Sequence, residues 1–222
     1  MTVETAPITI VLGTRNVKKE GEIALLMRPP WEHHPRLARL LLRTLDEWPT
    51  LPDVIEDEPT FAGNARKKAA ETARAVGHWV VADDSGLAVD ALVGEPGVLS
   101  ARYAGTHGDD DANTALVLSR LAGVADEDRG AAFVCTLALA DPSGTVRLEA
   151  EGLCRGRITR GPRGAGGFGY DPLFLIPEYH RTFGELSPLV KSQLSHRARA
   201  FSRFRVGLDR MIASGELGRV EE

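Results

Sequence analysis

Two adjacent aspartates, Asp83 and Asp84, occupy the position in this sequence that most directly indicates chemistry. They follow the apolar run WVVA at residues 79–82 and precede Ser85 and Gly86. Aspartate has poor strand propensity, and an ionised carboxylate is costly to bury without a partner. A buried strand that ends on two carboxylates therefore predicts a bound cation or polar ligand, although an Asx turn explains DDSG equally well. Because successive strand side chains point to opposite faces, both carboxylates reach one site only if the strand has already ended.

A second group of acids, Glu56, Asp57 and Glu58, lies in a connecting segment just before a predicted helix. Hard carboxylate oxygens suit Mg²⁺, which prefers one or two protein carboxylates together with water and substrate phosphates. The simpler interpretation of these three acids is a solvated acidic loop.

Two basic segments offer partners for an anion. GTRNVKK places Thr14, Asn16 and Lys19 after the first predicted strand, where a helix N-terminus favours phosphate oxygens. The segment is not a Walker loop, and solvated lysines at a helix start are common. In SHRARAF, His196 and Arg197 lie in the first turn of a predicted helix, where the dipole disfavours positive charge. A bound anion or carbonyl-rich ligand would reconcile them, as would solvent screening on an exposed helix.

The segment GAGGFGYDP at residues 164–172 predicts a loop that contacts a ligand. Its glycines let the backbone approach a ligand closely, and a loop this rich in glycine is entropically costly to order. The aromatic side chains Phe168 and Tyr170 offer faces on which a base can stack.

The elements that must position these residues alternate along the chain. Short β-branched or alternating runs predict strands at residues 8–12, 79–83, 131–141 and 146–158, the last two as a hairpin around PSG. Apolar residues at helical spacing predict helices at residues 18–27, 60–77 and 109–121 and a closing helix capped by Ser195. Residues 31–52 allow a helix followed by a strand or a strand with flanking turns. After Phe174 we expect irregular structure as far as Ser195. The fold class is a mixed α/β sheet flanked by helices.

Composition excludes several classes of protein. A chain of 222 residues, 43% of them hydrophobic, fits one domain, residues 1–222, with two lobes. Neither a secretion signal nor an apolar run of about 20 residues is evident, so we expect a cytoplasmic protein with no membrane partner. The net charge of −4 argues against nucleic acid as a partner. Cys135 and Cys154 lack further ligands at zinc spacing and are expected to be buried, reduced thiols.

Five motifs in this order and spacing resemble the inosine triphosphate pyrophosphatase family: TFAGNARKKA, ADDSGLAVDAL, PGVLSARYAG, GGFGYDPLF and KSQLSHRARA. The resemblance implies an elongated mixed α/β fold with two lobes around a central cleft, usually as a homodimer. It also implies hydrolysis of non-standard purine nucleoside triphosphates such as ITP, dITP and XTP to the monophosphate and pyrophosphate, with Mg²⁺ as cofactor.

The resemblance assigns roles at matching positions. It implies that Asp84 is the general base and that Glu56 and Asp84 hold Mg²⁺. The substrate-binding residues that it implies are Thr14, Arg15, Asn16, Val17, Lys18, Lys19, Ser85, Phe168, Gly169, Tyr170, Asp171, Lys191, His196 and Arg197. Within this set, Phe168 to Asp171 would pack on the purine, and Lys191, His196 and Arg197 would bind phosphate and recognise the base. The family's first loop usually reads Thr-Gly-Asn, whereas Arg15 takes the glycine position here, where its side chain would either crowd the phosphates or contact them.

These assignments predict a mechanism and a basis for selectivity. Asp84 would take a proton from a water that attacks the α-phosphorus, and Lys19 and Lys191 would offset charge on the leaving pyrophosphate. The purine 6-carbonyl would accept a hydrogen bond from Arg197 or His196, which an adenine amino group would not. The alternatives are a related pyrophosphatase of other base specificity and a nucleotide-binding module without turnover.

Overall fold

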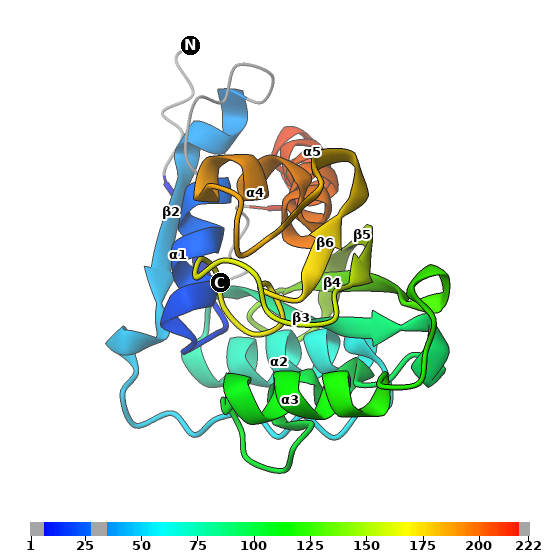
Figure 1. The fold of residues 1–222 in the computed structure, drawn as a ribbon. Helices are drawn as coiled ribbons and strands as arrows, with labels where there is room; N and C mark the ends of the chain where they lie inside the picture. The colour runs from blue at the N-terminus through cyan, green and yellow to red at the C-terminus, as the bar shows by residue number, and fades with distance from the viewer. Residues whose placement is uncertain (1–6, 28–34, 218–222) are drawn as a thin grey trace.

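The structure, a computed structural model, describes residues 7–27 and 35–217. Its centre is a seven-stranded sheet in the order β2-β1-β3-β4-β5-β6-β7 (Figure 1). β1 lies parallel between β2 and β3, and all later neighbours pair antiparallel. The predicted mixed sheet is confirmed. Its strands are β1 (Ile8–Leu12), β2 (Leu40–Thr44), β3 (Trp79–Val89), β4 (Gly130–Ala140), β5 (Val146–Ile158), β6 (Phe174–Ile176) and β7 (Arg181–Thr182).

Helices flank both faces of this sheet. The α-helices are α1 (Val17–Leu26), α2 (Phe61–Val76), α3 (Asp110–Arg120), α4 (Pro188–Leu194) and α5 (His196–Ser214). Shorter 3₁₀ turns are η1 (Pro35–Arg39), η2 (Leu45–Glu47), η3 (Asp90–Leu92), η4 (Gly97–Arg102), η5 (Asp126–Asp128) and η6 (Pro177–Tyr179). Thr60 and Ser195 cap α2 and α5 as predicted, because each hydroxyl accepts a hydrogen bond from an amide in the first turn.

Strand β3 is longer than the sequence predicts. It does not end on Asp83 and Asp84 but continues to Val89, and it pairs with β4 along ten residues from Val80 to Val89. The partner strand supplies hydrogen bonds to the β3 backbone throughout this run, and this outweighs the poor strand propensity of aspartate and glycine. Both aspartates therefore sit within a strand, and their side chains point to opposite faces of the sheet.

Two other segments resolve questions that the sequence leaves open. Within the described part of residues 31–52, the chain forms β2 between two 3₁₀ turns, which matches the strand alternative; residues 31–34 lie outside the described residues. The expectation of irregular structure after Phe174 is wrong, because β6, β7 and α4 form there. These elements are only two to seven residues long, and β6 and β7 depend on pairing with β5.

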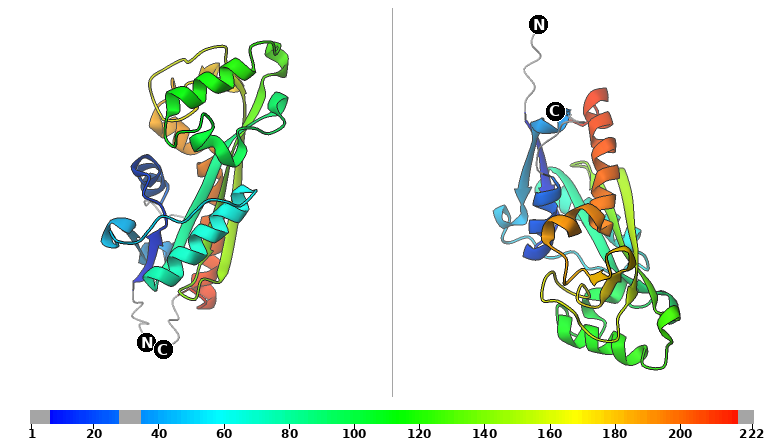
Figure 2. Two further views of the ribbon diagram at one scale, coloured as in Figure 1. Left: turned by 90° about the horizontal axis from the view of Figure 1, so that it is seen from below. Right: turned by 45° about the horizontal axis from the view of Figure 1, so that its top comes forward.

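Three clusters of buried side chains divide the molecule into two lobes. In one lobe, α5 covers one face of the sheet around Val81 and Leu137, and α2 covers the other around Val80 and Ala138. The second lobe has its own core around Phe133 and neighbouring strands and helices. Figure 2 shows β3, β4 and β5 running through both lobes. Among the described residues, no helix has the length and apolar character that a membrane span requires.

The two cysteines, Cys135 and Cys154, are buried and unpaired, as predicted. Burial raises the pKa of Cys135 to about 12 and that of Cys154 to about 11. Both side chains therefore belong to the packing of the two lobes as neutral thiols.

Candidate active site

The main cavity lies where β1 and β3 separate. β3 pairs with β1 only as far as Val81, whose carbonyl accepts a hydrogen bond from Gly13 at 2.8 Å as the chain leaves β1. Beyond this point β3 borders a cavity of about 630 Å³. In open α/β sheets, ligands bind where neighbouring strands diverge in this way.

The fold brings most of the predicted site residues to this cavity. They come from the loop after β1, the segment before α2, strand β3, the glycine-rich loop, α4 and α5. The predicted residues that line it are Thr14, Arg15, Asn16, Lys19, Glu56, Asp84, Ser85, Phe168, Gly169, Tyr170, Asp171, Lys191, His196 and Arg197.

Asp84 is held at the cavity by donors from three residues. Its Oδ2 accepts a hydrogen bond from Asn64 Nδ2 at 3.0 Å, and its Oδ1 accepts one from the Ser85 amide at 2.9 Å. Lys68 Nζ lies 3.8 Å from Oδ1. Burial raises the pKa of Asp84 above its ordinary value, and the nearby Glu56 carboxylate adds to the rise, while Lys68 opposes it. A carboxylate with a raised pKa at a cavity is suited to accept a proton.

Glu56 shares a cationic partner with Asp84. Lys68 Nζ donates to Glu56 Oε1 at 2.7 Å, and the Arg102 guanidinium donates to the Glu56 carbonyl at 2.9 Å. Burial by itself would raise the pKa of Glu56, but Lys68 holds it below the ordinary value. Asp57, in contrast, is exposed and pairs with a surface lysine, so only one acid of the EDE run reaches the cavity.

Asp83 points to the opposite face of β3 and belongs to a buried ion network. Its Oδ2 lies 3.3 Å from Lys19 Nζ and accepts hydrogen bonds from Arg197 Nη2 and Ser85 Oγ, both at 3.2 Å. Burial alone would raise the pKa of Asp83, but Lys19 and Arg197 hold it well below its usual range. Glu22 also accepts a hydrogen bond from Arg197 Nη1. The carboxylates of Asp83 and Glu22 therefore offset the cost of placing the Arg197 cation at a helix N-terminus.

Lys191 is also fully paired. Its ammonium donates to Glu22 Oε1 and to Asp171 Oδ2, each at 2.6 Å, and lies 4.8 Å from the centroid of the Phe168 ring. Burial raises the pKa of Asp171, while Lys191 opposes the rise. The Phe168 amide donates to the same Asp171 oxygen at 2.8 Å, so this ion pair also shapes the glycine-rich loop.

His196 is a neutral imidazole in this site. Its ring stacks on Phe133 with centroids 4.8 Å apart and an interplanar angle of 13°. Burial, reinforced by the Arg197 cation, lowers the pKa of His196 well below its ordinary value. A neutral imidazole both donates and accepts hydrogen bonds, so His196 does not present a cation to a base.

The glycine-rich loop brings both of its aromatic residues to the cavity. Residues 160–172 contain turns and bends but no helix or strand, as predicted. Gly167 has a φ of +76°, and a Cβ there would lie 2.0 Å from Asp171 Oδ2, so glycine is required. Phe168 and Tyr170 both line the cavity, and Tyr170 also packs in the core of the second lobe, where its hydroxyl donates to the Ser100 carbonyl at 2.9 Å.

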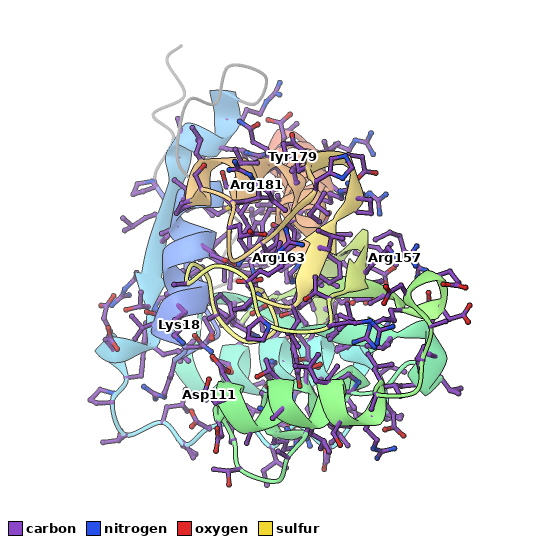
Figure 3. The ribbon with its side chains drawn as sticks, in the orientation of Figure 1. Lys18, Asp111, Arg157, Arg163, Tyr179 and Arg181 are labelled. Atoms are coloured by element: carbon purple, nitrogen blue, oxygen red, sulfur yellow. The ribbon has the colours of Figure 1, made fainter. Side chains whose placement is uncertain are left out.

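Val17 and Lys18 do not line this cavity. Val17 is 78% exposed. Lys18 lines a smaller cavity of about 340 Å³ that shares Phe168 and Lys191 with the first. Its ammonium lies 3.4 Å from Asp110 Oδ2, and Figure 3 shows Lys18 on α1 close to the start of α3, where Asp111 is labelled.

The sequence interpretation omits three further residues that contact predicted site residues: Glu22, Asn64 and Lys68. Asn64 and Lys68 lie four residues apart on α2, directly beside the buried row formed by Ala65 and Ala69. Polar residues repeated at helical spacing next to an apolar row are the signal that could have found them. For Glu22 the signal is weaker, because it is one acid among several charged residues of α1.

Glu56 and Asp84 form the part of the site that fits a divalent cation. Both carboxylates contact the same ammonium, so they converge on one cationic position. Two hard oxygen donors next to a cavity suit Mg²⁺, whose remaining ligands are water and substrate phosphates. Across residues 7–27 and 35–217, no group of three or more His, Cys, Asp or Glu side chains forms a cage for a metal.

The sequence is similar to those of known proteins over most of its length. A dITP/XTP pyrophosphatase of Rhodopirellula baltica is 52% identical over 205 residues, which cover 92% of this chain and 95% of that protein. A dITP/XTP pyrophosphatase of Shouchella clausii is 50% identical over 193 residues, which cover 87% of this chain and 92% of that protein.

Solved structures show the same architecture. A HAM1 protein from Coxiella burnetii superposes with a TM-score of 0.80 at 36% identity, covering 91% of this chain and 99% of that one. The nucleoside-triphosphatase / dITP/XTP pyrophosphatase of Mycobacterium abscessus superposes with a TM-score of 0.71 at 44% identity. The match covers 89% of this chain and 98% of that one. The model of the Ham1 family matches residues 10–206. The resemblance predicted from the five motifs is therefore confirmed, and the chain belongs to the Ham1 family.

Proposed function

We propose that this protein hydrolyses non-standard purine nucleoside triphosphates, namely ITP, dITP and XTP, to the nucleoside monophosphate and pyrophosphate. The observation that carries the proposal is the convergence of Glu56 and Asp84 on Lys68 at the open edge of β3. The same cavity contains Phe168 and His196, which suit a purine. Relatives 50% and 52% identical over most of their length are named dITP/XTP pyrophosphatases.

The proposal includes Mg²⁺, which Glu56 and Asp84 would hold. The cation would supply charge neutralisation at the triphosphate. Lys68 and Arg102 keep Glu56 ionised, as a metal ligand must be.

In the proposed reaction, Asp84 accepts a proton from a water molecule that attacks the α-phosphorus. The bond from the α-phosphorus to the bridging oxygen breaks, and pyrophosphate leaves. Asn64 and the Ser85 amide orient the Asp84 carboxylate, since both donate to it. Lys19 and Lys68, which lie beside the two aspartates, offset negative charge on the phosphates. Lys191 is paired with Glu22 and Asp171 next to Phe168, so we assign it to the base end of the cavity.

Selection of the base follows from hydrogen-bond polarity at the purine 6-position. Hypoxanthine and xanthine carry a 6-carbonyl, which accepts from the neutral His196 or from Arg197. Adenine carries an amino donor at this position, which cannot accept a hydrogen bond from either side chain. Replacing Arg197 with alanine should erode the preference for ITP over ATP, measured as the ratio of the two kcat/KM values. An unchanged ratio would reject this role for Arg197.

The decisive experiment measures pyrophosphate release from ITP, dITP, XTP, GTP and ATP with and without Mg²⁺. We expect turnover of the first three in the presence of Mg²⁺ and little turnover of ATP. Preference for another base would indicate a related pyrophosphatase of different specificity. Binding of ITP without release of pyrophosphate would indicate a nucleotide-binding module.

We further propose that the protein is cytoplasmic, since its substrates belong to a nucleotide pool. We also propose a homodimer, because the apolar residues Val93 and Leu99 are 97% and 46% exposed. Light scattering coupled to size-exclusion chromatography tests the dimer, and a monomer mass of about 24.0 kDa would contradict it.

A further inference from the structure

The Arg15 side chain is bound to a single neighbouring segment of the chain. We call residues 45–54 the wall segment. Arg15 Nη2 donates to the carbonyls of Trp48 and Leu51 at 3.0 and 2.8 Å, and Nη1 donates to the carbonyl of Leu45 at 3.3 Å. Its Nε donates to Asp53 Oδ1 at 3.2 Å. Every nitrogen of the guanidinium therefore contacts the wall segment.

The wall segment has little regular structure of its own. It contains the 3₁₀ turn η2, and the chain after this turn forms no helix or strand before α2 begins. Its own backbone contributes the hydrogen bonds from Trp48 to Leu45 and from Leu51 to Trp48. The Leu45 and Trp48 carbonyls each accept from one of these turns and from Arg15, whereas the Leu51 carbonyl accepts from Arg15. The guanidinium thus supplies hydrogen-bond donors to a segment that has few of its own.

The wall segment also forms one side of the cavity. Leu51, Pro52 and Val54 line it, and Glu56 follows two residues later. Thr14 and Asn16, which flank Arg15 in the loop after β1, also line the cavity. Arg15 therefore joins the substrate loop to the segment that leads into Glu56.

From these contacts we propose that Arg15 is a positioning residue, which fixes the wall segment and Glu56 relative to the substrate loop. Its kinetic consequence rests on the proposed function, because it concerns the same cavity. The rival role is direct contact with the triphosphate, for which a lysine would serve nearly as well. Only the planar guanidinium of arginine donates to several carbonyls at once, so a lysine cannot replace the contacts that Arg15 makes with the wall segment.

The test measures amide hydrogen exchange in the full-length Arg15→Ala and Arg15→Lys variants without nucleotide. Exchange is read from the peptic peptide that spans residues 45–54. We expect exchange at the Trp48 and Leu51 amides to accelerate about tenfold or more in both variants, because the carbonyl partners of these turns lose their anchor. The kcat/KM for dITP should also fall, and the two variants should show falls of similar size. The control is Arg36→Ala, which removes a surface pair with Asp209 and should change neither measurement.

Two outcomes would overturn the proposal. The first is unchanged exchange of residues 45–54 in both Arg15 variants while circular dichroism shows them folded. The second is Arg15→Lys with wild-type exchange and wild-type kcat/KM beside an impaired Arg15→Ala, which would indicate a simple charge contact with phosphate. If the wild-type protein fails to hydrolyse dITP, the exchange measurement still decides whether Arg15 holds the wall segment.

Discussion

At the scale of single residues, Asp83 and Asp84 show how neighbouring carboxylates acquire different roles. Asp83 faces two cations and its pKa lies well below the usual range, whereas burial raises the pKa of Asp84. Environments that push two carboxyl pKa values apart separate a permanently charged group from a group that exchanges protons. Asp83 therefore anchors Lys19 and Arg197, and Asp84 is free for chemistry.

Replacing Asp84 with asparagine tests this division directly. The amide keeps the shape of the side chain but cannot accept the proton from water, so we expect kcat for dITP to fall by roughly 10²- to 10⁴-fold. Pyrophosphate release at saturating dITP and Mg²⁺ is the measurement. Asp57→Asn makes the same change at an exposed acid and should retain activity. Turnover by Asp84→Asn within a few-fold of wild type would remove Asp84 from the mechanism.

Lys68 should set the acidic limb of the pH profile. Its charge lowers the pKa of both Glu56 and Asp84, so a neutral residue at this position raises both pKa values. Activity requires the deprotonated carboxylates and is lost as pH falls through these pKa values. In Lys68→Gln we therefore expect the acidic limb of kcat/KM for dITP to move to higher pH.

The matched control for Lys68 is Lys67→Gln, which removes a charge that pairs with the exposed Asp57. Its acidic limb should coincide with that of the wild-type protein. If Lys68→Gln leaves the limb in place, then neither Glu56 nor Asp84 governs it.

At the scale of elements, the predictable parts are those determined by local sequence. The caps at Thr60 and Ser195 and the apolar rows of α2 and α5 are visible in the sequence, so both helices could be located in advance. The continuation of β3 could not, because it depends on pairing with β4, whose residues lie about 50 positions later. For the same reason, the approach of Lys68 to Asp84 requires the packing of α2 on the sheet.

Asp110 links three elements that surround the cavity. One carboxylate oxygen at the start of α3 accepts from the Gly169 amide at 2.9 Å and pairs with Lys18 of α1 at 3.4 Å. Asp110→Ala removes both contacts, so the loop that carries Phe168 loses its hydrogen bond to α3. We expect KM for dITP to rise several-fold with a smaller change in kcat, measured by steady-state pyrophosphate release.

Two further variants make the Asp110 experiment specific. Asp110→Asn keeps a carbonyl acceptor for Gly169 and loses the charge beside Lys18, so its KM should lie between those of wild type and Asp110→Ala. Asp111→Ala alters the exposed neighbour in the same helical turn and should retain the wild-type KM. Equal KM values for wild type and Asp110→Ala would show that the Asp110 contacts have no effect on substrate binding.

At the scale of the whole molecule, a buried ion network joins segments that are distant in sequence. Glu22 of α1 accepts from Lys191 of α4 and Arg197 of α5, and Arg197 reaches Asp83 of β3. Lys191 also reaches Asp171 of the glycine-rich loop. Removing one partner of a buried pair leaves an uncompensated charge, which costs about 3–5 kcal/mol. The network therefore favours the arrangement of α1, α4 and α5 in which the cavity is complete.

Stability should decline as the solution becomes acidic, and His196 should begin the decline. Burial and the Arg197 cation lower the pKa of His196 well below 6.5 in the folded protein, so the unfolded chain binds the proton more readily. The stabilising contribution is thus complete above the unfolded pKa and is lost as pH falls toward the folded pKa. Below pH 6.5 this residue should reduce the free energy of unfolding by up to about 1.4 kcal/mol per pH unit. Asp83 adds a second loss only below about pH 4, because its folded pKa is lowered from 3.8.

Urea denaturation at pH 7 and pH 5 separates the His196 contribution from general acid effects. In His196→Gln the free energy of unfolding should change less between the two pH values than in wild type, although the variant is less stable at pH 7 because it loses the stacking on Phe133. His107→Gln, at an exposed position, should keep the wild-type dependence on pH. If His196→Gln loses as much stability as wild type on moving to pH 5, the imidazole is not held neutral in the fold, and selection of the purine 6-carbonyl by a neutral His196 fails with it.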